Sequence, residues 1–260
     1  MARAFGSLAY GTGCYLLGNV SIYGEKKIIL SAMFVAIALA LSVVNIFDKN
    51  ELTDVIDDLP DVSYKVFLHN NHRFVMMCAV LALIFFSYFA IDNYMLVIVE
   101  NIKGNSTDTG KILAIKAYLE VPIIFLYTKL VRRFSIRSLL KLSSVAFLIK
   151  SSLIYFAGSL FLVYLAQLFQ GLSFGLLLPA MVDFVDRYVA KREANRGQSL
   201  FIMSMNIGSI AAGFIAGNLC DKLGVRSMEL IALLVCLTGV IMFWILMDFG
   251  GRKNVRKKST

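Results

Sequence analysis

The sequence predicts an all-α integral membrane protein with about eight transmembrane helices. The first observation is composition: 58% of the 260 residues are hydrophobic and 17% are charged, whereas a soluble domain is about 45–50% apolar and about 25% charged. The second is that the apolar residues form runs of about 20, the length that a helix needs to cross a bilayer. The expected spans are 4–23, 27–47, 73–99, 106–131, 138–157, 159–186, 197–219 and 227–248.

One long connection, 48–72, separates the first two spans from the other six. It contains six acidic residues and is expected to link two helical bundles rather than to form a domain. His69 and His72 lie at its end, but no cysteine or further histidine accompanies them, as a metal site in a protein requires. An interfacial loop is therefore favoured, and no metal site is predicted.

Basic residues are concentrated in alternate connections. The connection 48–72 with Arg73, the connections near 129–141 and 187–196, and the C-terminal tail hold 17 Lys and Arg, whereas the opposite connections hold 6. Cytoplasmic loops carry the excess of Lys and Arg, so the long connection and both termini are expected in the cytoplasm, with the protein in the plasma (cell inner) membrane. This distribution explains the net charge of +9 without a nucleic-acid partner.

The span 106–131 is unusual because it carries Lys116 and Glu120 in its middle, followed by Pro122. A charge at the bilayer centre costs roughly 2.5–3.5 kcal/mol, so both side chains should face protein or a water-filled cavity. The proline removes one helix hydrogen bond and favours a kink. Charges beside a broken helix in the middle of the membrane indicate a transport pathway.

Glu120 has two candidate partners. With a helical rise of about 1.5 Å per residue, Glu120 and Lys150 lie about 16 and about 18 Å from the cytoplasmic ends of their spans, so a cross-helix pair is expected. Lys116, four residues before Glu120 on the same helix, is the alternative partner.

Other polar residues occur within the spans. Gln167 and Gln170 share one helix face at a depth similar to that of Glu120, while Asp92 lies nearer the outside and Asn206 nearer the inside. Such residues mark pathways or hold helices together by hydrogen bonds, and both interpretations stay open. Gly171-x-x-x-Gly175 and Gly213-x-x-x-Gly217 have the spacing typical of closely packed membrane helices.

Three stretches carry a family resemblance: Arg3-Ala-Phe-Gly-Ser-Leu-Ala-Tyr10, Glu120-Val-Pro-Ile-Ile-Phe125 with Arg132-Arg133-Phe134, and Arg196-Gly-Gln-Ser-Leu-Phe201 with Gly217-Asn-Leu-Cys-Asp-Lys-Leu-Gly-Val-Arg226. They are similar to the fifth helix, the eighth helix with its following loop, and the eleventh helix of the major facilitator superfamily. The closest resemblance is to the branch of lactose permease and related proton-coupled sugar or organic-acid symporters.

The resemblance implies a chain equivalent to helices 5–12 of a twelve-helix fold, without the first four helices. The implied division is 1–47, the last two helices of a truncated N-terminal half; 48–72, the cytoplasmic linker between halves; 73–250, the six-helix C-terminal half; and 251–260, a basic cytoplasmic tail.

The resemblance also implies a solute site. Arg3 matches the arginine that hydrogen-bonds the sugar, and Tyr10 matches the aromatic residue on which the sugar ring stacks. Glu120 resembles the acid of the eighth helix, and Lys150 falls at the basic position of the ninth. The implied substrate-binding residues are Arg3, Tyr10, Glu120, Lys150, Gln167 and Gln170.

The sequence departs from this branch in the tenth helix. Gln167 and Gln170 occupy the place of a His-x-x-Glu pair that couples protons to transport, and glutamine does not titrate. If protons are coupled, Glu120 or Asp92 must carry them. Lys150, where the family has arginine, lacks the bidentate fork of a guanidinium.

The expected function is secondary active transport of a small polar solute by alternating access, with protons as the candidate coupling ion. The alternative is a truncated, non-transporting remnant or membrane interaction partner, whose partner would be the missing N-terminal half. The sequence shows no zinc motif, no nucleophile with a base and no phosphate-binding loop. Neither enzyme activity nor a cofactor is therefore expected, and the solute remains open between a sugar, an organic acid, a nucleoside and a drug.

Overall fold

The computed structural model describes residues 2–20 and 64–256, with the side chains of 6–16 and 64–248. Within these ranges every regular element is helical, which confirms the all-α membrane fold. The elements are α1 (Ala2–Val20), α3 (Tyr64–Asn70), α4 (His72–Asn93), α5 (Met95–Asn101), α6 (Ser106–Arg133), α7 (Ile136–Tyr155), α8 (Leu160–Gln167), the π-helix η2 (Gly171–Gly175), α9 (Leu176–Tyr188), the 3-10 helix η3 (Lys191–Glu193), α10 (Ala194–Leu223) and α11 (Val225–Arg256).

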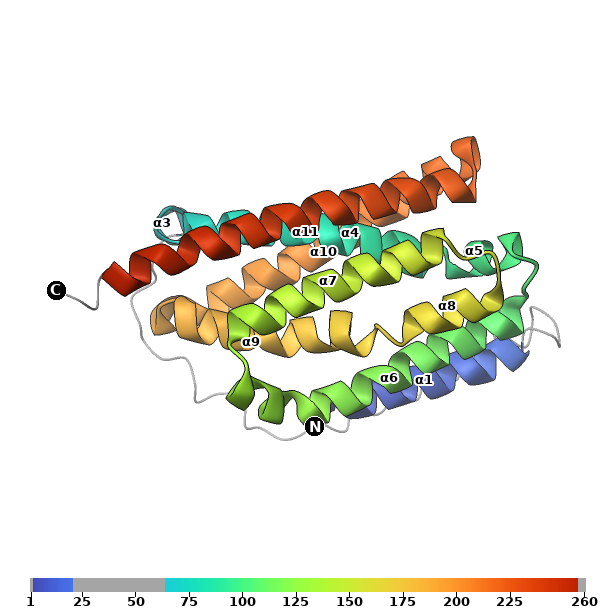
Figure 1. Ribbon diagram of the computed structural model, residues 1–260, viewed down its shortest axis with the longest axis horizontal. Coiled ribbons are helices and arrows are strands. Elements are labelled where there is room, and N and C mark those ends of the chain that lie inside the picture. Colours follow the sequence, from blue (N-terminus) through green and yellow to red (C-terminus); the bar gives the residue numbers. More distant parts are fainter. Residues whose placement is uncertain (1, 21–63, 257–260) are drawn as a thin grey trace, which may run out of the picture.

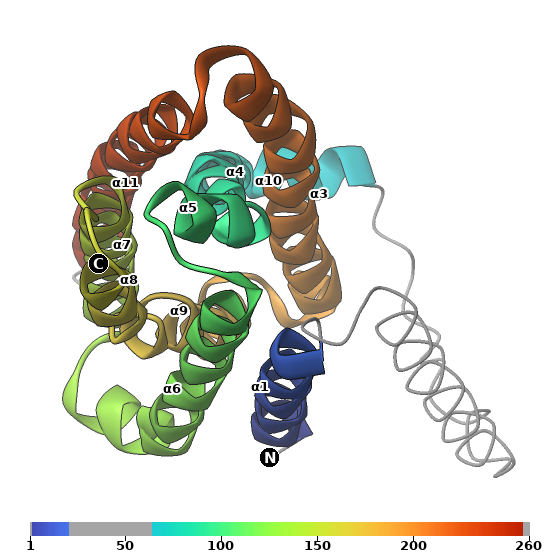
Figure 2. The same ribbon diagram turned by 90° about the vertical axis from the view of Figure 1, so that its right-hand side faces the viewer.

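The long helices run along one axis of the molecule, and α4 lies among the others (Figures 1 and 2). α4 packs against α7, α10 and α11, while α1 packs along α6. The most apolar stretch of α4 is 67% buried, against 28% for α10 and 33% for α11. α4 is therefore the central helix of the bundle, and α10 and α11 present apolar side chains to the lipid.

Seven of the eight expected spans coincide with helices. The span 27–47 and most of the connection 48–72 lie outside the described residues. Five segments of the described part are long and apolar enough to cross a membrane, namely His72–Asn93, Ile136–Tyr155, Leu160–Tyr188, Lys191–Leu223 and Val225–Asp248. Helix α6 has 28 residues, but its charged residues, among them Lys116 and Glu120 in the middle, exclude it from these five segments. The protein is thus a multi-pass membrane protein, and the count of eight spans stays a prediction.

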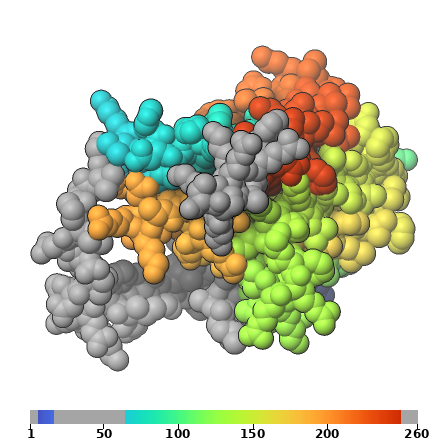
Figure 3. Space-filling view, turned by 60° about the vertical axis from the view of Figure 1, so that its left-hand side comes forward, coloured from blue at the N-terminus to red at the C-terminus, as the bar shows by residue number. Residues whose placement is uncertain are grey.

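The basic connections lie together. α3, the α6–α7 turn, the α9–α10 connection and the end of α11 come together at one end of the molecule (Figures 1 and 3). We call this the basic end. The α5–α6 and α10–α11 connections lie at the opposite end (Figure 1). The helices therefore alternate in direction, as the distribution of Lys and Arg predicts.

The expected break at Pro122 is wrong, because α6 continues as one helix from Ser106 to Arg133. A proline inside a membrane helix removes one donor, and neighbouring turns and helices can still hold the segment together. The interrupted helix is instead the sixth predicted span, where α8 ends at Gln167 and the chain resumes through the π-helix η2. Pro179 cannot donate to the carbonyl of Gly175, the last residue of η2, and this favours a widened turn there.

The helices α6 and α7, which carry Lys116, Glu120 and Lys150, have defined starting points. α6 begins with a capping box, in which the Asp108 amide donates to Asn105 Oδ1 at 3.0 Å and the Asn105 amide donates to Asp108 Oδ2 at 3.1 Å. α7 begins where the Ser138 amide donates to Ser135 Oγ at 3.1 Å. These caps fix where the helical periodicity of α6 and α7 begins, and with it the faces on which their charges lie.

The two glycine motifs differ in their packing. Gly171 and Gly175 are both buried, and a Cβ at Gly171 would lie 2.6 Å from the carbonyl oxygen of Leu119 in α6. In the second motif Gly217 packs against the Tyr94 hydroxyl, whereas a Cβ at Gly213 would meet nothing within 4 Å. Gly213 contributes its carbonyl instead, which accepts a hydrogen bond from that hydroxyl at 2.9 Å.

Gly11 sets the close approach of α1 to α6. It is buried, and a Cβ there would lie 2.9 Å from Cε1 of Tyr118 and 3.0 Å from Cβ of Ala117. We expect Gly11→Val to push α1 away from α6 and to lower the free energy of unfolding by roughly 1–3 kcal/mol, the usual cost of overpacking. The measurement is thermal unfolding of the purified protein in detergent.

Gly13→Val is the matched control, because a Cβ at Gly13 meets nothing within 4 Å although it adds the same β-branched residue to the same helix. Equal destabilisation by the two variants would show that helix propensity, and not the α1–α6 contact, determines the effect.

Candidate functional site

A buried polar cluster lies where α1, α4, α6, α7 and the turn between α8 and η2 meet. We call it the central cluster and define it as Ser7, Tyr88, Asp92, Lys116, Glu120, Lys150 and Gln170. Three of its four charged members are removed from solvent: Lys116 is 4%, Glu120 7% and Lys150 3% exposed, while the Asp92 side chain is 17% exposed. Three of the four helices contribute a charge, so the cluster exists only when the bundle is assembled.

Asp92 of α4 and Lys116 of α6 form a direct ion pair. Lys116 donates to Asp92 Oδ1, and its ammonium group also lies 5.7 Å from the ring centroids of Tyr10 and Tyr88. Lys116 is therefore not a partner of Glu120, and this sequence-based alternative is wrong. The pair balances a buried cation that would be costly alone.

Glu120 and Lys150 are joined through a third residue. Lys150 donates to Gln170 Oε1, and Gln170 Nε2 donates to Glu120 Oε1 at 2.7 Å. The expected direct Glu120–Lys150 pair is replaced by this bridge, since no direct ion pair joins the two among the described residues. A carboxamide has both an acceptor and a donor end, so one neutral side chain satisfies a cation and an anion together.

The interrupted helix positions Gln170. Its backbone amide donates to the carbonyl of Gln167 at 2.9 Å in the turn after α8. In the following π-helix, Ser143 Oγ of α7 donates to the carbonyl of Ser173 at 2.7 Å. The irregular backbone is thus held from α7, and Gln170 is placed between α6 and α7 with no exposure to solvent.

Like Ser7, Tyr88 is a residue of the cluster that the sequence did not single out. Gln170 Nε2 donates to its hydroxyl at 3.1 Å, and the Lys150 ammonium lies 5.2 Å from its ring centroid. The ring stacks on Phe174 with centroids 4.9 Å apart. Tyr88 lies four residues before Asp92, on the same face of α4, so this spacing to a membrane-embedded acid was the available signal.

The central cluster borders a cavity of about 430 Å³, within the size range of small-molecule sites. Ser7 of α1 reaches across it and donates to Glu120 Oε2 at 3.1 Å. Lys150 and Gln170 lie behind the lining residues and do not line the cavity themselves. The lining residues are Gly6, Ser7, Tyr10, Tyr88, Asp92, Lys116, Ala117, Glu120 and Phe174.

The remaining predicted site residues have different positions. Tyr10 is 50% exposed and lines the cavity. Gln167 is fully buried, where its Nε2 donates to the carbonyl of Val163 at 3.3 Å and its Oε1 has no partner. Asn206 is exposed on α10. Arg3 belongs to α1, but its side chain lies outside the described residues.

Comparison with known proteins identifies one family. The family model described as "MFS_1 like family" matches residues 1–228, a range that contains every residue of the central cluster. No curated protein sequence matches the chain.

Proposed function

The chain belongs to the MFS_1 like family of the major facilitator superfamily, and from this premise we propose that it is a secondary transporter for a small polar solute. The observation that supports the proposal is the central cluster, in which two carboxylates and two ammonium groups lie within a membrane bundle beside a cavity, and all but the Asp92 carboxylate are buried. Ionisable residues inside membrane spans mark solute and ion pathways, and transporter sites lie near the midplane beside interrupted helices. Movement by alternating access follows from this class of fold.

Within this proposal the site residues divide into two groups. Ser7, Tyr10, Asp92, Lys116 and Glu120 line the cavity and bind the solute directly. Lys150 and Gln170 act from behind, because they hold the Glu120 carboxylate by the hydrogen-bonded bridge. Arg3 enters only through the family resemblance. The half-exposed ring of Tyr10 offers an apolar face for stacking, while the charged groups select polar solutes.

We assign proton coupling to Glu120 rather than to Asp92. The Asp92 carboxylate is held by Lys116 in an ion pair. Among the residues whose side chains the structure describes, the Glu120 carboxylate has no direct cationic partner, and it joins Ser7 of α1 to Gln170 in the turn after α8. A protonated carboxyl group has one acceptor site fewer, so proton binding weakens one of these two links and changes how firmly α1 is held.

We place the basic end in the cytoplasm, following the positive-inside rule, and the protein in the cell membrane with both termini inside. Opening of the cavity then alternates between the cytoplasmic and the external side.

A cysteine at Ser7 tests alternating access without knowledge of the solute. In a background without Cys14, Cys78, Cys220 and Cys236, Ser7→Cys is expected to react with an impermeant maleimide added to either side of a sealed membrane. Ser87→Cys is the control, because Ser87 is fully buried against Ser151 and should stay unlabelled from both sides. Labelling of Cys at position 7 from one side only, under all pH gradients, contradicts the proposal.

A further inference from the structure

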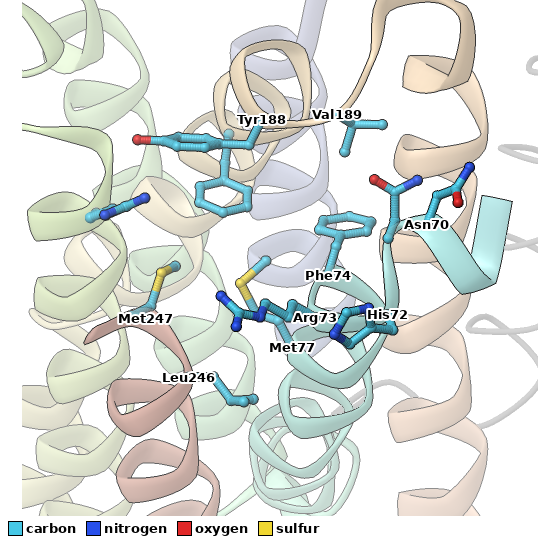
Figure 4. A pocket seen from close by; sticks show the side chains of 12 residues that line it. Asn70, His72, Arg73, Phe74, Met77, Tyr188, Val189, Leu246 and Met247 are labelled. Atoms are coloured by element: carbon cyan, nitrogen blue, oxygen red, sulfur yellow. The ribbon is translucent and has the colours of Figure 1, made fainter. Parts of the chain in front are cut away.

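A second cavity, of about 350 Å³, lies at the basic end of the molecule. It is framed by the start of α4, the start of α7, the end of α9 and residues 246–247 of α11. Figure 4 shows that the side chains of Arg73, Met77 and Met247 extend into the same space between the helix ends. None of its lining residues belongs to the central cluster. We call it the basic-end cavity.

The basic-end cavity carries an excess of positive charge. Arg73 of α4 and Arg137 of α7 reach it from two helices, and His72 lies beside them. No acidic residue lines the cavity. Among the described residues, neither arginine forms an ion pair. Two guanidinium groups that share a cavity repel each other, and a bound anion would reduce this repulsion.

Two acids close in sequence to lining or neighbouring residues of the cavity are already engaged. Asp248 follows the lining residue Met247, but it forms an ion pair with Lys141. Glu193 is buried and accepts a hydrogen bond from Asn71 Nδ2 at 2.8 Å. Neither of these two carboxylates is therefore available to Arg73 or Arg137.

Arg137 keeps its donors available for an anion. Its guanidinium carbon lies 5.0 Å from the ring centroid of Tyr188, and Tyr188 in turn stacks on Phe184 with centroids 4.5 Å apart. A cation–π contact with a ring uses none of the N–H donors of the guanidinium group, so these donors stay available for hydrogen bonds. Planar pairs of N–H donors match the oxygens of a phosphate group.

Much of the remaining lining is apolar, and this limits the class of ligand that fits the cavity. Half of its lining consists of hydrophobic side chains, of which Phe74 and Phe184 stack with centroids 6.4 Å apart. A free phosphate ion gains no binding energy from an apolar surface. A ligand that joins a phosphate to a hydrocarbon part satisfies both the arginines and the apolar wall.

We propose that the basic-end cavity binds the phosphate group of an anionic phospholipid from the leaflet on the basic side. The position fits, because basic cavities between the cytoplasmic ends of membrane helices meet lipid head groups at that depth. The site joins α4, α7, α9 and α11, so an occupied cavity ties together four helices of the six-helix bundle. This site is independent of solute transport through the central cluster.

The test uses the purified full chain in a neutral detergent, titrated with short-chain phosphatidylglycerol and, separately, phosphatidylcholine or inorganic phosphate, with bound lipid counted by native mass spectrometry. The unaltered protein is expected to retain phosphatidylglycerol in preference to the other two. Arg73→Gln with Arg137→Gln is expected to weaken retention roughly 30-fold, the effect of two basic residues at an anionic lipid surface.

Lys191→Gln with Arg192→Gln is the matched control, because it removes the same charge from exposed residues of η3 at the same end. It should leave retention within about twofold of the unaltered protein, as surface charges contribute little. If the double glutamine variant fails to fold, Arg137→Lys replaces it, which keeps the charge and loses the planar fork. Equal weakening by both pairs, or no preference for phosphatidylglycerol, overturns the proposal. Tighter binding of inorganic phosphate assigns the cavity to a soluble phosphate compound and overturns the lipid assignment.

Discussion

Glu120→Gln is expected to abolish solute accumulation against a gradient while the protein still inserts and folds. Glutamine has nearly the same shape as glutamate, and its amide oxygen can still accept the hydrogen bond that Gln170 Nε2 donates at 2.7 Å. It cannot take up or release a proton, so the proposed pH-dependent link from Ser7 of α1 through residue 120 to Gln170 is lost. The measurement is uptake into proteoliposomes of labelled sugars, organic acids and nucleosides, with and without an inward proton gradient.

Glu100→Gln is the control for this result, because Glu100 is an exposed acid on α5, outside the central cluster. It should accumulate solute as the unaltered protein does. Exchange of solute across the membrane, which needs no net proton movement, is expected to survive in the Glu120→Gln variant. Undiminished uphill uptake by that variant would remove Glu120 from proton coupling and leave Asp92 as the candidate.

Asp92→Asn is expected to produce the largest loss of stability, about 3–5 kcal/mol, because it leaves the buried Lys116 ammonium group without its carboxylate. Lys116 is 4% exposed and has Asp92 as its ion-pair partner. The double variant Asp92→Asn with Lys116→Met should recover most of this loss, since methionine fills a similar volume without a charge. Chemical or thermal unfolding in detergent micelles measures the free energy of unfolding of the unaltered protein and of both variants.

The pair of Lys141 and Asp248 provides the comparison, because it joins the same residue types at a position where the Asp248 side chain is 67% exposed. Asp248→Asn should cost less than about 1 kcal/mol, as exposed ion pairs do. If Asp92→Asn costs no more than Asp248→Asn, the Asp92–Lys116 pair is solvated in the protein, and the buried-charge argument for the central cluster fails.

Several features of the fold follow from local sequence. The helix positions could be predicted because a chain in lipid must satisfy its own backbone hydrogen bonds, which leaves a long apolar run little choice but to form a helix. The alternation of basic connections could likewise be predicted from local sequence, and in the structure these connections lie at the basic end of the molecule. The expected start of the span 106–131 coincides with the start of α6 at Ser106, where Asn105 and Asp108 have the spacing of a capping box.

The position of the helix interruption could not be predicted from local sequence in the same way. Pro122 is a stronger breaker than any residue between Gln167 and Gln170, yet α6 continues through it and the chain bends after α8. The carbonyl of Ser173 gains a donor from Ser143 on α7, which supports irregular backbone there. Such support comes from a neighbouring helix and is invisible in the sequence of the interrupted segment.

The residues alone identify this protein as a helical membrane protein in which Lys116 and Glu120 face away from lipid, because the cost of a charge in hydrocarbon is a property of the residue itself. The groups that balance those charges are known only from the packing of the helices: Asp92 for Lys116, and Gln170 between Glu120 and Lys150. Depth along each helix could be counted from the sequence, and it correctly brought Glu120 and Lys150 to the same level. The rotation of each helix about its axis could not be counted, and since each residue turns the helix by a large angle, rotation determines which side chains meet.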